Sequence, residues 1–181
     1  MQDSSNKFTS MTIFLHWFIG ITVIVLIAVG LYMSENEVWD LYPIHKSIGI
    51  ILFLFILYRI VRRMQRGWPT PIGENAKWEL LLSKTIHWIL ILGTLLFPIS
   101  GMMMSGASGN GIAVFGFDLL AANYNAAGEA IAINETLADI GHETHEILGT
   151  VMIIAIALHI LAALKHHYIV KDNTLKRMLG K

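Results

Sequence analysis

Four long apolar stretches dominate the sequence and restrict what the chain can fold into. They cover roughly residues 11–33, 43–61, 82–104 and 142–166. Each is close to the ~20 residues that a helix needs to cross a hydrocarbon core. Lipid offers the backbone no hydrogen-bond partner, so such spans must be helices, and the ~10-residue alternating segments of a barrel do not occur. The sequence therefore predicts an all-α membrane protein, a four-helix transmembrane bundle forming one domain over residues 1–181.

The composition agrees with a membrane protein. Hydrophobic residues make up 55% of the chain and charged residues only 14%, whereas a soluble domain carries about 25% charged residues. Cysteine is missing, which excludes disulfides, iron–sulfur clusters, Cys-ligated zinc and covalently attached haem. The first stretch is longer than a signal-peptide core of about 7–15 residues and has no cleavage site after it, so it is predicted to be a retained span.

The basic residues predict the orientation of the bundle. Most of them lie before the first stretch, between the second and third, or around the end of the fourth, all of which fall on one side of the membrane: Lys7, Arg62, Arg63, Arg66, Lys77, Lys84, Lys165, Lys171, Lys176, Arg177 and Lys181. Loops 34–43 and 105–141 contain no lysine or arginine, and Lys46 is the only base near them. By the positive-inside rule, both termini are predicted to be cytoplasmic. The opposite side is acidic, with Glu35, Glu37, Asp40, Asp118, Glu129, Glu135, Asp139, Glu143 and Glu146.

The 105–141 loop is long for a connection within a bundle, and long loops often carry function. It begins with the glycine-rich segment Ser105–Gly111, and we expect it to cover the outer end of the bundle. Its part from Glu129 to Ile140 is predicted to form a short surface helix. On the other side, Arg59 near the end of the second stretch is expected to extend toward lipid headgroups.

Four of the eight histidines lie in the apolar stretches, at two predicted depths: His16 with His159, and His45 with His145. A buried imidazole needs a partner, because an unpaired polar group costs roughly 2–7 kcal/mol. His145 and His159 are separated by ~21 Å of helix rise, and their directions differ by only ~40°. One helix can therefore supply a ligand at each of two depths.

Two imidazoles on facing helices can bind one haem iron from both sides, which favours electron transfer over oxygen binding. We therefore expect an outer haem at His45 and His145. An inner haem is expected at His16 and His159. Five glycines would either let a flat ring approach the backbone or let helices pack closely: Gly20, Gly49, Gly93, Gly101 and Gly149. The alternatives are hydrogen bonding within the bundle, a proton path, and a zinc or copper site, which needs three or four converging ligands.

The other histidines lie nearer the ends of the spans. His87 opens the third stretch, and His166 lies seven residues beyond His159. Both are candidates for proton transfer to a quinone, or for simple capping of helix ends. His142 is one helical turn from His145 and is an alternative ligand.

Several short motifs resemble the bacterial cytochrome b561 family, most closely its small four-helix superoxide oxidase members. They are Leu15-His16-Trp17, Ile44-His45, Thr144-His145-Glu146, Leu158-His159, His166-His167-Tyr168 and Lys171-Asp172-Asn173-Thr174-Leu175. The resemblance covers the whole chain. It implies two non-covalent b-type haems, with the family's axial ligands at His16, His45, His145 and His159.

The resemblance also implies an activity. Such members oxidise superoxide at the periplasmic face of the bacterial inner membrane and pass the electron to ubiquinone, and His87 and His166 match histidines near the quinone site. The acidic outer loops disfavour an anionic donor, although Lys46 offers a positive charge that would attract superoxide. A non-catalytic electron-transfer subunit for a periplasmic redox protein is therefore the alternative, and a metal-ion transporter is another. Lipid and quinone are expected partners; nucleic acid is not.

Overall fold

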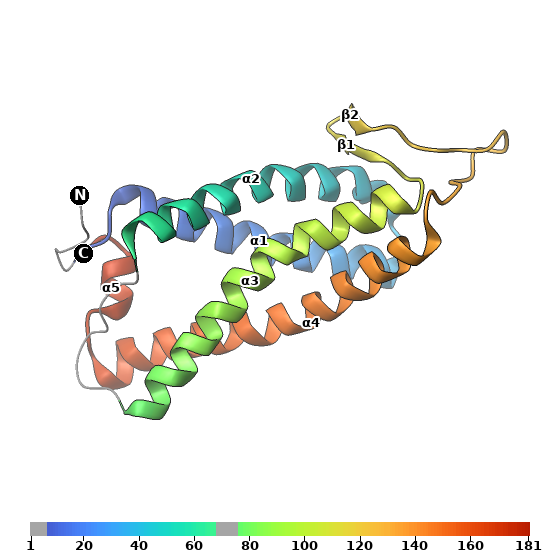
Figure 1. The fold of residues 1–181 in the computed structure, drawn as a ribbon. Helices are drawn as coiled ribbons and strands as arrows, with labels where there is room; N and C mark the ends of the chain where they lie inside the picture. The colour runs from blue at the N-terminus through green and yellow to red at the C-terminus, as the bar shows by residue number, and fades with distance from the viewer. Residues whose placement is uncertain (1–6, 68–75) are drawn as a thin grey trace.

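Four long helices make up most of the computed structural model, which describes residues 7–67 and 76–181. They are α1 (Ser10–Asn36), α2 (Tyr42–Arg66), α3 (Lys77–Ala107) and α4 (Glu135–Lys165). The helices lie alongside one another in an elongated bundle (Figure 1). A single 3-10 turn, η1 (Trp39–Leu41), joins α1 to α2.

All four helices are long and apolar enough to cross a membrane. The predicted transmembrane bundle is confirmed, and the chain is a multi-pass membrane protein. Each helix begins before its predicted span, and in α1 and α4 a polar side chain caps the start. Thr9 Oγ1 accepts a hydrogen bond from the Thr12 N–H at 3.4 Å, and Asn134 Oδ1 accepts one from the Leu137 N–H at 3.0 Å. These caps satisfy amides that a helix start leaves without partners.

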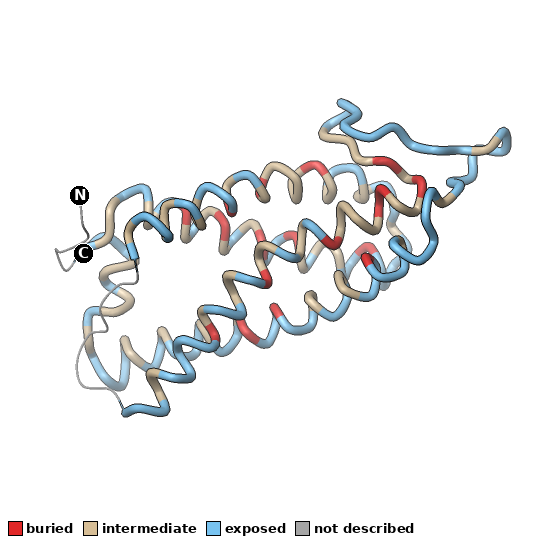
Figure 2. Tube along the Cα trace, in the orientation of Figure 1, coloured by how far each residue is buried: buried red, intermediate tan, exposed pale blue. Residues whose placement is uncertain are grey.

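The core lies where α1 meets α2 and α4. It contains Leu15, Ile19, Val23, Leu26, Leu52, Ile56 and Met152. The members from α1 recur every three or four residues, so they lie on one face of that helix. Many other large apolar side chains are exposed around the bundle (Figure 2). This distribution suits helices whose outer faces contact lipid tails.

α3 and α4 pack closely at two glycines. A Cβ at Gly141 of α4 would lie 2.5 Å from the Met104 nitrogen and 2.9 Å from the Met104 Cα in α3. Further along, Gly93 of α3 makes room for the Met152 side chain. Small residues allow helix backbones to pack this closely in membranes. The contact brings α3 carbonyl groups within reach of α4 side chains.

The connection between α3 and α4 is shorter than predicted and contains strands. It covers residues 108–134 and includes an antiparallel hairpin of β1 (Ile112–Val114) and β2 (Phe117–Leu120). β1 packs against α2. We call the end of the bundle that carries this connection the outer end.

The predicted surface helix over Glu129–Ile140 is wrong. Its second half belongs to α4, which begins at Glu135 after the Asn134 cap. Its first half is extended because it pairs with the preceding chain: the Ile131 N–H donates to the Asn123 carbonyl at 2.7 Å. A local sequence pattern does not show hydrogen bonds between separate segments of the connection.

The opposite, inner end of the bundle is closed by the C-terminal segment. α4 continues into a π-helical turn, η2 (His166–Val170), followed by α5 (Thr174–Met178). The Trp17 indole N–H donates to the Met178 carbonyl at 2.8 Å, which ties α5 to α1. The beginning of α1 and the C-terminal helix therefore lie at the same end (Figure 1), as an even number of spans requires.

Replacing Gly141 with alanine should destabilise the protein, because the new methyl group would press on the α3 backbone. Overpacking of this kind costs about 1–3 kcal/mol, which exceeds alanine's advantage of about 1 kcal/mol in a helix. The midpoint of thermal unfolding in detergent, followed by circular dichroism, should fall. Gly149→Ala is the matched control, because its Cβ would lie 3.8 Å from Phe97 Cζ in ordinary contact. Equal stability of the two variants would contradict the proposed contact.

Candidate functional site

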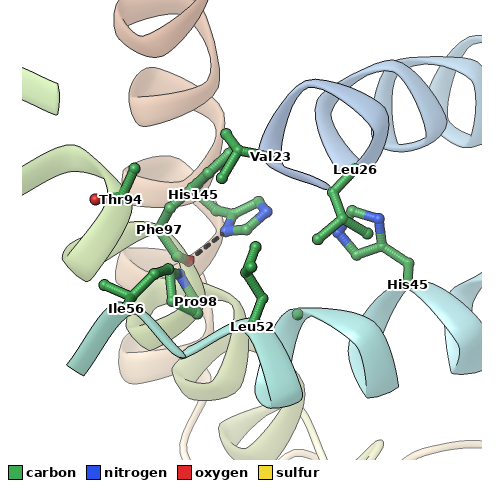
Figure 3. A pocket seen from close by; sticks show the side chains of 10 residues that line it. Val23, Leu26, His45, Leu52, Ile56, Thr94, Phe97, Pro98 and His145 are labelled. Carbon is green, nitrogen blue, oxygen red and sulfur yellow. Dashed lines mark hydrogen bonds between the residues drawn. The ribbon is translucent and has the colours of Figure 1, made fainter. Parts of the chain in front are cut away.

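The outer pair of histidines faces a cavity inside the bundle. The rings of His45 in α2 and His145 in α4 lie 6.4 Å apart between centroids, at 74° to each other. A small pocket lies beside them, with apolar walls that include Leu26, Leu52 and Phe97. Figure 3 shows the two imidazoles entering from opposite sides. The prediction that these residues share one depth therefore agrees with their positions in the bundle.

His145 is held firmly by α3. Its Nδ1 donates to the Phe97 carbonyl at 3.0 Å and lies 3.1 Å from Ser100 Oγ, and the Phe97 ring stacks on it at 4.3 Å. A carbonyl oxygen can only accept, so the ring proton is on Nδ1 and the lone pair is on Nε2. Gly101 leaves room for the ring, since a Cβ there would lie 3.1 Å from His145 Cε1. This is the arrangement by which proteins orient a metal-binding histidine.

His45 differs from His145 in its hydrogen bonding. Its Nδ1 is buried and has no hydrogen-bond partner among the described residues. A Cβ at Gly30 of α1 would lie 3.4 Å from His45 Cε1, so this glycine also makes space for an imidazole. Unpaired buried polar atoms are rare and need an explanation.

The inner pair comes together in the same way. The rings of His16 in α1 and His159 in α4 lie 6.0 Å apart at 64°. Arg59 of α2 donates from Nη2 to His16 Nδ1 at 3.3 Å. The expectation that Arg59 extends toward headgroups is therefore wrong. Its guanidinium points into the bundle instead, because His16 on the neighbouring helix α1 accepts a hydrogen bond from it.

Both ring separations suit two ligands on opposite sides of one metal ion. A metal–imidazole bond is about 2 Å long, and adding a ring radius of about 1 Å on each side gives roughly 6 Å between centroids. Within residues 7–67 and 76–181, no group of three or more His, Asp or Glu side chains is placed to hold a metal ion. A group that brings its own equatorial ligands, as haem does, fits two pairs better than zinc or copper does.

His87 lies beside the inner pair. Its ring is 5.4 Å from that of His159, edge to face. Its Nδ1 donates to the Ser83 carbonyl one turn earlier in α3, at 2.6 Å. The side chain is only partly buried, so it connects the inner pair with the surroundings of the bundle.

His166 makes a contact that the sequence did not predict. It begins η2, and its Nδ1 lies 2.6 Å from Asp172 Oδ2. Partial burial alone would raise the pKa of Asp172, but hydrogen bonds from the Thr174 N–H and from His166 hold that pKa below its ordinary value. In the described chain, no hydrogen bond or ring contact joins His166 to His87. The structure thus puts the two quinone-site candidates in separate surroundings.

Lys46 lies at the outer end, one residue after His45. Its ammonium group donates to Ser105 Oγ at 3.0 Å and to the Asn110 and Gly111 carbonyls at 3.4 and 3.3 Å. It also lies 4.7 Å from the Tyr42 ring centroid. None of these partners carries a negative charge, so the positive charge of Lys46 is not neutralised by them.

Comparison with known proteins agrees with this architecture. The family model for prokaryotic cytochrome b561 matches residues 7–181. The chain is 34% identical over 172 residues to cytochrome b561 homolog 2 of Escherichia coli (strain K12), covering 92% of this chain and 87% of the relative. The chain belongs to the prokaryotic cytochrome b561 family. It is therefore a membrane electron-transfer protein of a family whose members bind haem b.

Two further relatives match nearly the whole chain. The probable superoxide oxidase CybB of Yersinia pestis is 28% identical over 180 residues, covering 97% of each chain. Cytochrome b561 homolog 1 of Escherichia coli (strain K12) is 28% identical over 181 residues, covering 97% of this chain and 98% of the relative.

Sequence reasoning missed several residues around the cytochrome b561 histidines: Gly30, Arg59, Phe97, Ser100 and Asp172. Arg59 had a usable signal, because an arginine within an apolar span usually has a partner inside the bundle. Asp172 also had one, as the single acid in a basic tail. Gly30, Phe97 and Ser100 had none, since ordinary apolar and small residues gain a role only when another helix packs beside them.

Proposed function

We propose that this cytochrome b561 holds two b-type haems and moves electrons across the bacterial inner membrane, from superoxide outside to ubiquinone. The proposal rests on the two histidine pairs, which lie at two depths in the bundle. In each pair the distance between the rings suits two imidazoles that bind one metal ion from opposite sides. Both termini are cytoplasmic in this proposal, because the basic residues concentrate at the inner end.

His45 and His145 would hold the outer haem, and His16 and His159 the inner one. When bound, haem supplies an iron that changes oxidation state by one electron, and two histidines leave it no open position. The Phe97 carbonyl keeps the Nε2 lone pair of His145 available. His16 differs, because a hydrogen bond from Arg59 requires the lone pair on Nδ1. Iron binding by a neutral His16 through Nε2 would exclude this hydrogen bond, so Arg59 would have to release the ring for His16 to hold a haem in that way.

The overall reaction oxidises two superoxide ions to two molecules of oxygen and reduces one quinone, which takes up two protons to become a quinol. His87 is proposed to serve the quinone as a proton donor, supported by its position beside His159 and its partial burial. His166 is proposed to transfer protons from the inner side, supported by its bond to Asp172.

Observations on the electron donor point in two directions. The relative named as a probable superoxide oxidase supports superoxide, and Lys46 supplies a positive charge near His45. The acidic outer loops instead favour a positively charged periplasmic redox protein, because like charges slow the approach of an anion. A non-catalytic electron-transfer subunit is therefore the second candidate function.

Alanine at one histidine of a pair should remove one haem and spare the other. His45→Ala and His145→Ala should each leave one haem per chain with the same spectrum. His16→Ala and His159→Ala should leave the other haem, with a second, shared spectrum. The pyridine haemochrome assay and the α band measure both quantities, and His142→Ala is the control that keeps two haems. A folded wild-type protein without colour would overturn the haem proposal and favour a metal-ion pathway.

Superoxide should reduce the haems rapidly in a stopped-flow experiment. With ubiquinone present, two superoxide ions should be consumed for each quinol formed. Lys46→Gln should slow haem reduction by up to ~10-fold without changing haem content, because the local field then weakens. If superoxide leaves the haems oxidised while a basic periplasmic redox protein reduces them, the subunit function replaces the enzyme.

His87→Ala should slow quinone reduction while superoxide still reduces the haems at the normal rate. Loss of a general acid typically lowers the rate of the catalysed step 10²–10⁴-fold, so the rate of quinone reduction should fall by at least ~100-fold. Single-turnover reoxidation of reduced haem by ubiquinone measures this step alone. His167→Ala is the control, as a histidine with no proposed role. Unchanged reoxidation in His87→Ala would return His87 to a structural role.

A further inference from the structure

The hairpin of β1 and β2 exposes aromatic side chains at its tip. Phe115 and Phe117 flank Gly116 and are 65% and 72% exposed. Phe115 has φ of +47°, a conformation that bulky residues rarely adopt. Glycine or asparagine would suit this backbone better, so phenylalanine occupies the position against the local conformational preference.

The tip is fixed at a defined position on α2. The Phe115 N–H donates to Ser47 Oγ at 2.8 Å, and Ser47 donates to the Pro43 carbonyl at 2.7 Å. Ser47 is 1% exposed because the hairpin covers it. The tip therefore lies beside α2, on the side away from the other helices (Figure 1).

This contact gives the tip a depth in the membrane. α2 has 25 residues, hence a length of ~37 Å, against a hydrocarbon thickness of ~30 Å. A centred α2 therefore extends ~4 Å beyond the hydrocarbon at each end. Ser47 is five residues into α2, ~7 Å from its outer end, which places it just inside the hydrocarbon boundary.

Apolar side chains near the tip are exposed on both α2 and β2. Ile44, one turn before Ser47, is exposed, and so is Leu119 of β2. Alternation along β2 puts Phe117 and Leu119 on one face and Asp118 on the other. A carboxylate between them suits the headgroup boundary and not the bilayer centre. Aromatic side chains concentrate at this boundary.

We propose that the hairpin tip, residues Phe115, Gly116 and Phe117, is an interfacial anchor that inserts into the outer leaflet. Its partner is the lipid surface, at the level where headgroups meet acyl chains. The anchor holds the base of the hairpin, whose Asn110 and Gly111 carbonyls bind the Lys46 ammonium. The membrane itself thereby helps to fix the cover next to His45.

The lack of cysteine makes a direct test possible, because a single introduced cysteine can carry a nitroxide label. Phe117→Cys and Leu119→Cys are labelled in the full chain, and Ala126→Cys in the exposed turn of the same connection is the control. The proteins are placed in vesicles of phosphatidylethanolamine and phosphatidylglycerol. Power-saturation electron paramagnetic resonance then compares collisions with oxygen, which concentrates in lipid, and with a water-soluble nickel chelate.

The label at 117 should collide several-fold more with oxygen, relative to nickel, than the label at 126. The label at 119 should give an intermediate ratio, since it lies nearer the base of the hairpin. Nickel access at 117 and 119 equal to that at 126 would show a hairpin in water and overturn the proposal. Protection of both positions from both reagents would show that protein, such as a second copy of the chain, covers the tip, and would also overturn it.

Discussion

The absence of water inside the bilayer is the constraint on which the rest of the structure depends. Every polar group there must find a partner in the protein or in a cofactor. The backbone meets the requirement by forming four helices. The imidazole of His145 meets it through the Phe97 carbonyl, and His16 through Arg59. His45 does not meet it with protein atoms, since its Nδ1 has no partner among the described residues.

α4 links the two depths of the bundle. It carries His145 near the outer end and His159 near the inner end, and its glycine at 141 packs against α3. This packing holds α3 close enough for Phe97 to orient His145. A helix that supplies one histidine to each pair keeps the two pairs in fixed relation, which suits transfer of electrons between them.

The two ends of the bundle differ in chemistry. At the outer end, Lys46 is surrounded by neutral acceptors and the connecting chain carries acidic residues. At the inner end, basic residues dominate, and the acid of Asp172 is paired with His166. The inner end thus places titratable groups beside the membrane surface, where the proposed quinone would take up protons.

The sequence by itself determined the four spans, the two depths and the membership of His16, His45, His145 and His159 in two pairs. It could do so because hydrophobic length and helical periodicity are local properties. The tertiary structure alone decided what orients each ring, which way Arg59 points, and that 129–134 is extended. Those features depend on contacts between segments far apart in the chain, such as Phe97 with His145, Ile131 with Asn123 and Ser47 with Phe115. No local pattern encodes them, because each partner is an ordinary residue until the other helix or loop packs beside it.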